Sequence, residues 1–401
     1  MKRILLMLLT LSLCLSACSA PAVKTAERAE AEQKTAEEKT SEEEPMEKTE
    51  VKETEEGKTE EKAPVAPLEG YTPFIYSLAD HVGGYKIFGR SFVNGFGLNV
   101  DFAANGFELE GEFGGEVLLE YSADVKTYFQ VYIDGQPGER IVTGVGRSRT
   151  VRIADAVPNG VHTLRIVRDT DATKAGELMA LKAVYLIGKE DSIHATPESD
   201  VYIEFVGDSI TAGKYTEMQY VEGDAIHKAT NSYAYRTAVE LGADYSVVAR
   251  GGCGFFRVST CPKTMNQLYP YQNGFAKEPV SYQPARRADV VVLALGTNDS
   301  ASNVKESFEN GTVPFATFED ALKDQIRLIR EMHGQDVKIV LLYGMMSTTW
   351  EKEFKATAES EGTYLLKVTK NRAGGKNHPS TAGHTVMATE LVRYLRSEVL
   401  K

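Results

Sequence analysis

Four short segments in the second half of the chain carry residue types that suit acyl transfer. They are GDSITAG with Ser209, RGGCG with Gly252, GTND with Asn298 and NHPS with His378. A serine hydroxyl is a weak nucleophile until a base such as histidine removes its proton. Glycine lets backbone N–H groups approach a bound oxygen, and an asparagine amide can donate to the same oxygen. Together the segments predict a serine nucleophile, a histidine base and an oxyanion-binding site.

The elements that must position these residues follow from a change in hydrophobic pattern after Ser199. Runs rich in Val, Ile and Leu occupy 201–206, 245–249, 289–295 and 337–343, and apolar residues recur at helical spacing in 318–333 and 388–399. Strands that alternate with helices predict a parallel sheet covered on both faces. Sites in such sheets lie beyond the carboxyl ends of the strands, where Ser209, Gly252 and Asn298 stand. His378 precedes a proline, which favours an extended loop that can reach Ser209.

In the part of the chain before this domain, apolar and polar residues alternate with the two-residue period of β-strands. Residues 117–121, 129–133, 151–153 and 164–167 are strand-like, and Asp134-Gly135 and Asn159-Gly160 are turn signals. Many short strands separated by turns predict an all-β sandwich. We therefore expect two folded domains. The first is a jelly-roll-like β-sandwich at 67–190, and the second, at 199–401, is an α/β domain whose parallel sheet is flanked by helices.

The four segments resemble the sequence blocks of the SGNH (GDSL-type) hydrolases. Ser209, Gly252, Asn298 and His378 match the Ser, Gly, Asn and His blocks, and the neighbouring Gly251 leaves the register of the Gly block open by one residue. A β-sandwich ahead of such a domain further resembles carbohydrate esterase family 2, whose members remove acetyl groups from xylan and related polysaccharides. The resemblance covers about residues 68–401.

This resemblance implies an acetylxylan esterase-like serine carboxylic-ester hydrolase that works through an acyl-enzyme. Ser209 is then the nucleophile and His378 the base, and the N–H groups of Ser209 and Gly252 and the amide of Asn298 form the oxyanion hole. The mechanism needs no cofactor. The Cys and His residues also lack the spacing of metal ligands.

One departure from the SGNH pattern concerns the acid that usually orients the histidine. That aspartate normally stands three, sometimes two, residues before the histidine, where this chain has Gly375 and Lys376. Some family 2 members are similar in lacking the acid and use a backbone carbonyl instead. A carbonyl could fix the tautomer of His378 without supplying charge. The alternatives are a Ser-His dyad that works without an orienting group, another group that orients His378, or a weak or inactive enzyme.

Residues beside the four blocks have structural or substrate-binding interpretations. Asp208 and Asp299 are expected to hold the Ser and Asn turns through backbone N–H groups, and His384 is expected to be structural. Trp350, the only tryptophan, is either a tentative sugar-stacking contact or a core aromatic. Four further aromatic side chains either line the cleft or pack in the core, and the first of them is our other tentative substrate contact: Phe255, Phe256, Tyr269 and Tyr271.

The chain begins with an export signal. A basic start is followed by an almost wholly apolar run at 4–15, which is too short to span about 30 Å of hydrocarbon and suits a signal peptide. The following Leu-Ser-Ala-Cys resembles a bacterial lipobox, so residues 1–18 are interpreted as a lipoprotein signal with Cys18 as the lipidated residue. An ordinary signal peptide cut near Ala20 is the alternative. We expect an extracytoplasmic protein, anchored to a membrane through Cys18 at the bacterial cell surface.

Residues 19–66 are rich in Glu, Lys and Thr, with 15 glutamates against eight lysines and arginines between 24 and 62. Such composition predicts a disordered linker. The acidic charge also argues against nucleic-acid partners. Cys253 and Cys261 could form a disulfide in an exported protein, but their spacing does not require it.

The expected partner is an acetylated polysaccharide, and oligomeric state stays undetermined by the sequence. Two other functional hypotheses remain open. One is an SGNH esterase for another acyl ester, such as the O-acetyl groups of peptidoglycan. The other is a catalytically weak, carbohydrate-binding lipoprotein.

Overall fold

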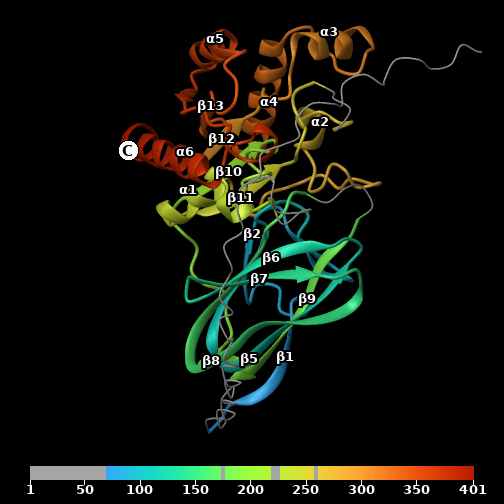
Figure 1. The fold of residues 1–401 in the computed structure, drawn as a ribbon, viewed down its shortest axis with the longest axis vertical. Coiled ribbons are helices and arrows are strands. Elements are labelled where there is room, and N and C mark those ends of the chain that lie inside the picture. Colours follow the sequence, from blue (N-terminus) through green and yellow to red (C-terminus); the bar gives the residue numbers. More distant parts are fainter. Residues whose placement is uncertain (1–68, 173–176, 218–225, 257–260) are drawn as a thin grey trace, which may run out of the picture. The chain divides into compact units, whose positions relative to one another are not determined.

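The computed structural model describes residues 69–172, 177–217, 226–256 and 261–401. The predicted signal peptide, Cys18 and the predicted linker at 19–66 lie outside the described residues. Two sheets follow one another along the described chain, first an antiparallel sheet and then a parallel sheet (Figure 1). The change falls between Gly188, which ends the last antiparallel strand, and Tyr202, which begins the first parallel one.

The antiparallel sheet has nine strands in the order β3-β4-β9-β5-β8-β6-β7, with β1 paired to β9 and β2 paired to β5. Two of the strands are unusually long, so short neighbours can pair with different parts of them. The strands are β1 (Thr72–Ser77), β2 (Lys86–Phe88), β3 (Phe92–Asn94), β4 (Gly97–Asn99), β5 (Gly106–Ala123), β6 (Thr127–Ile133), β7 (Gln136–Thr143), β8 (Gly146–Arg168) and β9 (Met179–Gly188).

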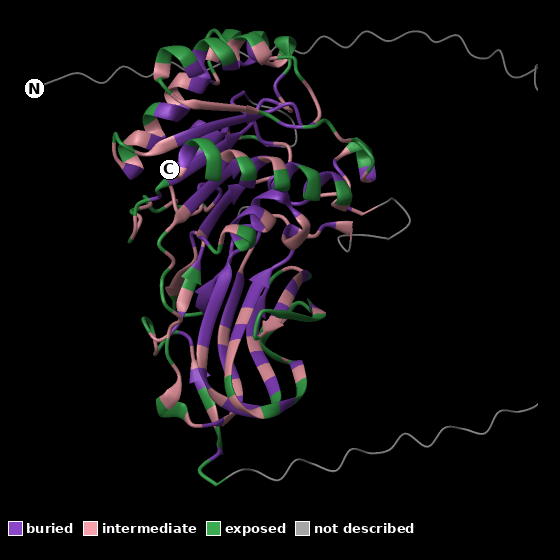
Figure 2. Ribbon diagram, turned by 90° about the vertical axis from the view of Figure 1, so that its left-hand side faces the viewer, coloured by how far each residue is buried: buried purple, intermediate pink, exposed green. Residues whose placement is uncertain are grey.

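The side chains of these strands alternate between a buried face and a more exposed face, as period-2 patterning requires (Figure 2). In β5, for example, Phe107, Leu109 and Phe113 are fully buried in one apolar cluster. The predicted β-sandwich domain is confirmed. One detail was wrong: Asn159-Gly160, expected as a turn, lies within β8, where Gly160 pairs with Phe113. Irregular register between 113 and 118 absorbs these residues without reversing the chain.

The parallel sheet has five strands in the order β11-β10-β12-β13-β14. They are β10 (Tyr202–Gly207), β11 (Asp244–Ala249), β12 (Val290–Ala294), β13 (Lys338–Tyr343) and β14 (Tyr364–Lys367). Every neighbouring pair is parallel. The first four strands lie where the apolar runs predicted them. Because β10 has β11 on one side and β12 on the other, its carboxyl end lies at the point where strand order reverses, the usual place for a site in such sheets.

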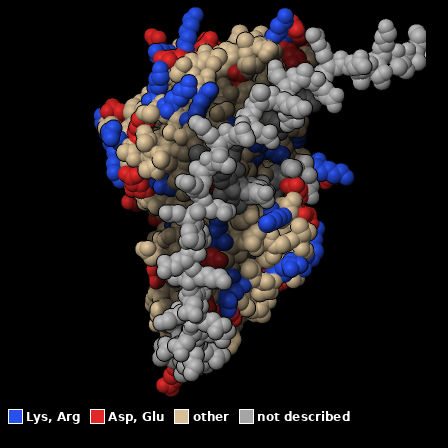
Figure 3. Space-filling view, in the orientation of Figure 1, with Lys and Arg blue, Asp and Glu red and all other residues tan. Residues whose placement is uncertain are grey.

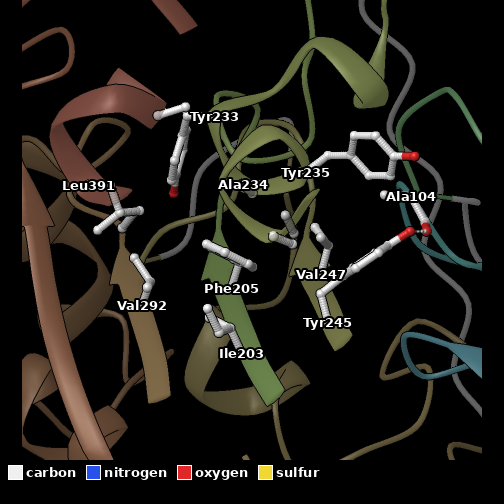
Figure 4. Close-up of a cluster of buried hydrophobic side chains, with 14 of the residues drawn as sticks. Ala104, Ile203, Phe205, Tyr233, Ala234, Tyr235, Tyr245, Val247, Val292 and Leu391 are labelled. Carbon is white, nitrogen blue, oxygen red and sulfur yellow. Dashed lines mark hydrogen bonds between the residues drawn. The ribbon is translucent and has the colours of Figure 1, made fainter. Parts of the chain in front are cut away.

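Helices pack on both faces of the parallel sheet, which confirms the predicted α/β domain. Successive residues of β10 enter different cores: Phe205 packs with Tyr233 and Leu391 on one face (Figure 4), and Val206 packs with Phe318 on the other. The helices are α1 (Tyr233–Leu241), α2 (Met265–Leu268), α3 (Ala301–Glu309), α4 (Phe318–His333), α5 (Glu351–Glu361) and α6 (Thr381–Tyr394), which continues as a π-helix (Leu395–Val399). Short 3₁₀ turns occupy Glu190–Ser192, Ala229–Asn231 and Gly375–Asn377.

A buried ion pair joins the two sheets. Arg90, in the loop after β2, donates to Glu204 of β10 over 3.0 Å, and neither side chain is exposed to solvent. The rings of Tyr269 and Tyr282 lie 4.5 and 4.3 Å from the guanidinium. His333 lies 3.2 Å from the same carboxylate. The described residues accordingly form one compact unit. Within them, no helix combines the length and the apolar character needed to cross a membrane.

Candidate active site

Ser209 lies on a tight turn directly after β10. Gly207 begins this turn at a place where any side chain would collide, because an added Cβ would lie 2.0 Å from the Thr211 hydroxyl. The Asp208 carboxylate accepts a hydrogen bond from the N–H of Ile210 over 2.9 Å. The turn therefore projects the nearly buried Ser209 beyond the carboxyl end of the strand.

His378 lies on the loop between β14 and α6. Its Nε2 atom is 2.8 Å from the Ser209 hydroxyl oxygen, although 169 residues separate the two in sequence. The loop is fastened to the Ser turn, because the N–H of Gly375 donates to the carbonyl of Tyr215 over 2.9 Å. The ring of Tyr215 also packs on His378, with 4.8 Å between ring centres. The structure thus brings the predicted nucleophile and base into hydrogen-bonding contact.

The Nδ1 atom of His378 lies 3.2 Å from the backbone carbonyl of Lys376. A carbonyl oxygen only accepts, so Nδ1 carries the proton and Nε2 is left to accept from Ser209. This geometry requires left-handed backbone at two non-glycine residues, Lys376 (φ 47°) and Asn377 (φ 59°). Such conformations are uncommon outside glycine and gather at functional sites.

The imidazole of His378 is poised in its neutral form. Its partial burial lowers the pKa below the ordinary value of 6.5, and the positive charges of Lys214 and Lys376 lower it further. The hydrogen bond to the Lys376 carbonyl opposes this shift only in part. A neutral imidazole can accept a proton, which is what a general base must do near neutral pH.

The Gly block follows β11 and contains the predicted oxyanion donor Gly252. Its φ of 83° lies in the region that favours glycine. The N–H of the preceding Gly251 is already bonded to Asp171, 3.2 Å from both carboxylate oxygens. Of the two glycines whose register the sequence left open, Gly251 therefore has its N–H engaged. The next residue, Cys253, forms a disulfide with Cys261.

Asn298 follows β12, and its side-chain amide meets both other blocks. Its Nδ2 donates to the Cys253 carbonyl over 2.8 Å and to the Asp208 carboxylate over 3.2 Å. Both amide hydrogens are thus engaged in the substrate-free protein. An oxyanion could accept one of these amide hydrogens only if Asn298 gave up one of its two present bonds. The bond to Asp208 is the longer of the two.

Two buried aspartates connect the blocks. Asp208 bonds within the Ser turn, as expected. Asp299 does not hold its own Asn turn as expected, because its carboxylate accepts from the N–H groups of Phe255 and Phe256 in the Gly segment. Burial raises the pKa of Asp208 to about 7 and that of Asp299 to about 6. These carboxylates fix loops, and neither bonds to His378.

The two tentative substrate contacts differ. Trp350 is partly exposed, stacks on Phe318 at 4.4 Å between ring centres, and donates from Nε1 to the Asp299 carbonyl over 2.9 Å. It therefore stands beside the Asn block with its orientation fixed. Phe255 is fully buried and packs edge-on against Phe318. The expectation that Phe255 contacts substrate is therefore corrected: its ring is part of the core.

His384 is buried, and its Nδ1 accepts from the N–H of Tyr233 over 3.1 Å. Its burial lowers its pKa to about 3, as suits a structural histidine. Sequence reasoning missed Tyr215, which makes two of the contacts between the Ser turn and the His loop. No spacing rule points to it, although its positive φ of 58° marks it in the structure. Among the described residues, no group of His, Cys, Asp and Glu side chains could hold a metal ion.

Comparison with known proteins agrees with both parts of this architecture. Residues 205–386 match the GDSL-like lipase/acylhydrolase family, and residues 94–184 match the carbohydrate esterase 2 N-terminal family. The first match begins in β10 and ends in α6, and the second begins in β3 and ends in β9.

Individual relatives are distant. The chain is 26% identical over 307 residues to the cellulase/esterase CelE of Acetivibrio thermocellus, covering 72% of this chain and 36% of that protein. It is 25% identical to an acetylxylan esterase / glucomannan deacetylase of Cellvibrio japonicus, covering 51% of this chain and 61% of that protein. The chain thus spans less than two thirds of either relative. An acetyl xylan esterase structure from Butyrivibrio proteoclasticus shares the fold, with a TM-score of 0.70, 20% identity, and coverage of 82% of this chain and 99% of that one.

Proposed function

We propose that this chain, which belongs to the SGNH hydrolases and carries the N-terminal domain of carbohydrate esterase family 2, is a serine esterase that removes acetyl groups from a polysaccharide. The observation that carries the proposal is the 2.8 Å contact between Ser209 and His378, with the tautomer of His378 fixed by the Lys376 carbonyl. The substrate class is proposed from the names of the relatives: acetylated xylan or a related polysaccharide.

In the proposed mechanism, Nε2 of His378 takes the proton of the Ser209 hydroxyl as the oxygen attacks the acetyl carbonyl carbon. The tetrahedral oxyanion is held by the N–H groups of Ser209 and Gly252 and by the Asn298 amide, which exchanges its bond to Asp208 for one to the oxyanion. His378 then gives its proton to the departing sugar oxygen, leaving an acetyl-serine. Water, deprotonated by the same imidazole, attacks this ester, and the imidazolium returns the proton to the departing Ser209 oxygen as acetate is released.

The visible part of one face carries charges of both signs, which suits a neutral ligand better than a strongly charged one. Lys and Arg side chains are interspersed with Asp and Glu over the face in Figure 3.

We further propose that the protein is exported and anchored through Cys18, outside the described residues. Incorporation of a labelled fatty acid that is lost in Cys18→Ser would support the anchor, and equal labelling of both proteins would contradict it.

The test of the activity is acetate release from acetylated xylan and acetylated glucomannan by the full chain. We expect Ser209→Ala to lower the rate about 10⁴-fold or more, since removal of the nucleophile disables the catalytic unit. Ser302→Ala, an exposed serine near the Asn block, is the matched control and should retain full activity. Release from O-acetylated peptidoglycan alone would favour the other acyl-ester hypothesis, and no release from any ester would favour the binding lipoprotein.

A further inference from the structure

The segment that follows β8 leaves the antiparallel sheet and enters the catalytic loops. It carries two aspartates, Asp169 and Asp171, whose side chains are 1% and 16% exposed. Asp169 pairs with Arg140 and bonds to Thr230, neither of which belongs to the Gly block. Asp171 instead reaches the two loops that present the nucleophile and the predicted oxyanion donor.

Asp171 contacts both loops at once. Its carboxylate accepts from the N–H of Gly251 at 3.2 Å and pairs with the ammonium of Lys214 at 2.9 Å. Lys214 belongs to the nucleophile turn, since its N–H donates to the Ser209 carbonyl over 2.9 Å. One carboxylate from the sandwich domain therefore links the turn of Ser209 to the Gly block.

The fit around this link is close. A Cβ added at Gly251 would lie 2.6 Å from Cδ of Lys214, 2.8 Å from its Nζ and 2.9 Å from Oδ2 of Asp171. A side chain at 251 would therefore displace the ends of the Lys214 and Asp171 side chains from their present positions. Gly251 thus packs directly on the Asp171–Lys214 pair, whereas the N–H of the next residue, Gly252, is the proposed oxyanion donor.

We propose that Asp171 is a positioning residue for the esterase reaction: by holding Gly251 and Lys214, it fixes the N–H of Gly252 relative to Ser209. This inference rests on the proposed function. It means that the antiparallel domain takes part in building the oxyanion hole. Oxyanion donors act well only when they are held in place before charge develops.

The same pair sets the charge beside the base. Lys214 and Lys376 are cations that lower the pKa of His378, the Tyr215 ring packs on the imidazole, and His384 interacts with it electrostatically. Asp171 pairs with Lys214 over 2.9 Å and so offsets part of its positive charge. Loss of the carboxylate should lower the pKa of His378, and loss of the ammonium should raise it.

The experiment compares Asp171→Ala, Asp171→Asn and Lys214→Met in the full chain, with p-nitrophenyl acetate as substrate. Removing one oxyanion donor costs about 10²–10³ in kcat, so a displaced donor in Asp171→Ala should cost about 10- to 100-fold, with KM changed less than about 3-fold. Asparagine still offers an acceptor to Gly251 and should restore most of the lost kcat. The acid limb of the pH profile should move to lower pH in both Asp171 variants and to higher pH in Lys214→Met.

Asp169→Asn is the matched control, because it removes a more deeply buried carboxylate two residues away. It should lower the melting temperature yet leave kcat and the acid limb unchanged. A role of Asp171 in folding alone would give the same pattern for both aspartates, with no opposed pH shifts, and would overturn the proposal.

Labelling of Ser209 by a fluorophosphonate separates this inference from the polysaccharide assignment. Labelling by the native chain without acetate release from polysaccharides would refute the substrate, while slower labelling of Asp171→Ala than of Asp169→Asn would still support the positioning role. Equal labelling rates would overturn the role. A native chain that neither labels nor hydrolyses p-nitrophenyl acetate would overturn both.

Discussion

His378 has a backbone carbonyl where the usual triad has a carboxylate. The roughly 10⁴-fold loss in the serine-protease variant that lacks its triad carboxylate arises largely from the wrong imidazole tautomer. The carbonyl of Lys376 prevents that error, because it can accept only from Nδ1–H. What it does not supply is negative charge, so nothing in this contact stabilises the imidazolium as strongly as an aspartate would.

The pH dependence should reflect this arrangement. The pKa of His378 is lowered below its ordinary value of 6.5, and the reaction needs the neutral imidazole. Activity should therefore be lost only as the pH falls through a midpoint below 6.5, and the neutral form persists above it. The measurement is kcat/KM against pH with a neutral ester, and a midpoint above 7 would indicate an unrecognised anion beside the ring.

Substitution of Lys376 should separate its carbonyl from its side chain. Asparagine tolerates the left-handed conformation that residue 376 adopts, so Lys376→Asn should keep kcat within about threefold. The lost positive charge should move the acid limb slightly upward. Loss of activity comparable to that of His378→Ala would mean that the lysine side chain takes part in catalysis.

At the scale of elements, the Gly block depends on its disulfide. Cys253 lies between Gly252 and the disulfide partner Cys261, and its carbonyl holds Asn298. Closing a loop of this length restricts the unfolded chain. The bond should contribute about 2–3 kcal/mol to the free energy of unfolding.

Removal of this disulfide can be tested with Cys253→Ala/Cys261→Ala. We expect the free energy of unfolding of the variant to be lower by about 2–3 kcal/mol. Its kcat should also fall, because the Cys253 carbonyl that holds Asn298 is no longer fixed by the disulfide. Reductant should destabilise the native chain similarly and leave the double variant unaffected. Equal stability of the oxidised chain and the double variant would contradict the expectation.

Elements with a strong local signal could be predicted from sequence. The apolar runs of β10 to β13 are buried on both faces, and the chemistry of the four blocks demands particular residue types. The short, half-buried β14 gave no such signal, and Asn159-Gly160 marked a register irregularity instead of a turn. The resemblance implied a backbone carbonyl beside His378, but neither its identity as that of Lys376 nor the contact of Asp171 could be predicted, because a left-handed lysine and a contact between domains follow from no local pattern.

At the scale of the whole molecule, the described chain depends on the buried pair of Arg90 and Glu204. Arg90→Met should destabilise the fold by about 3–5 kcal/mol, because it leaves a buried carboxylate uncompensated. The pKa of Glu204 is lowered, chiefly by Arg90 against the cost of burial. The ionised Glu204 therefore stabilises the fold fully at pH values above its ordinary pKa of 4.5. This stabilisation is lost as the pH falls toward the lowered pKa that Glu204 has in the folded protein.

The difference in the free energy of unfolding between native and Arg90→Met protein can be measured by chemical denaturation at pH 7. Arg152→Met, which removes an exposed arginine of β8, is the control and should change stability by less than about 1 kcal/mol. A similar effect of both substitutions would show that the buried pair contributes nothing special.

The Arg90–Glu204 contact also bears on how such proteins can be recombined. A catalytic domain excised at residue 199 would keep Glu204 in its first strand but lose the guanidinium that faces it. It would also lose the carboxylate of Asp171 beside Gly251. A chimeric protein that is to contain this active site must therefore include both domains, because contacts between them complete the buried ion pair and hold the Gly block.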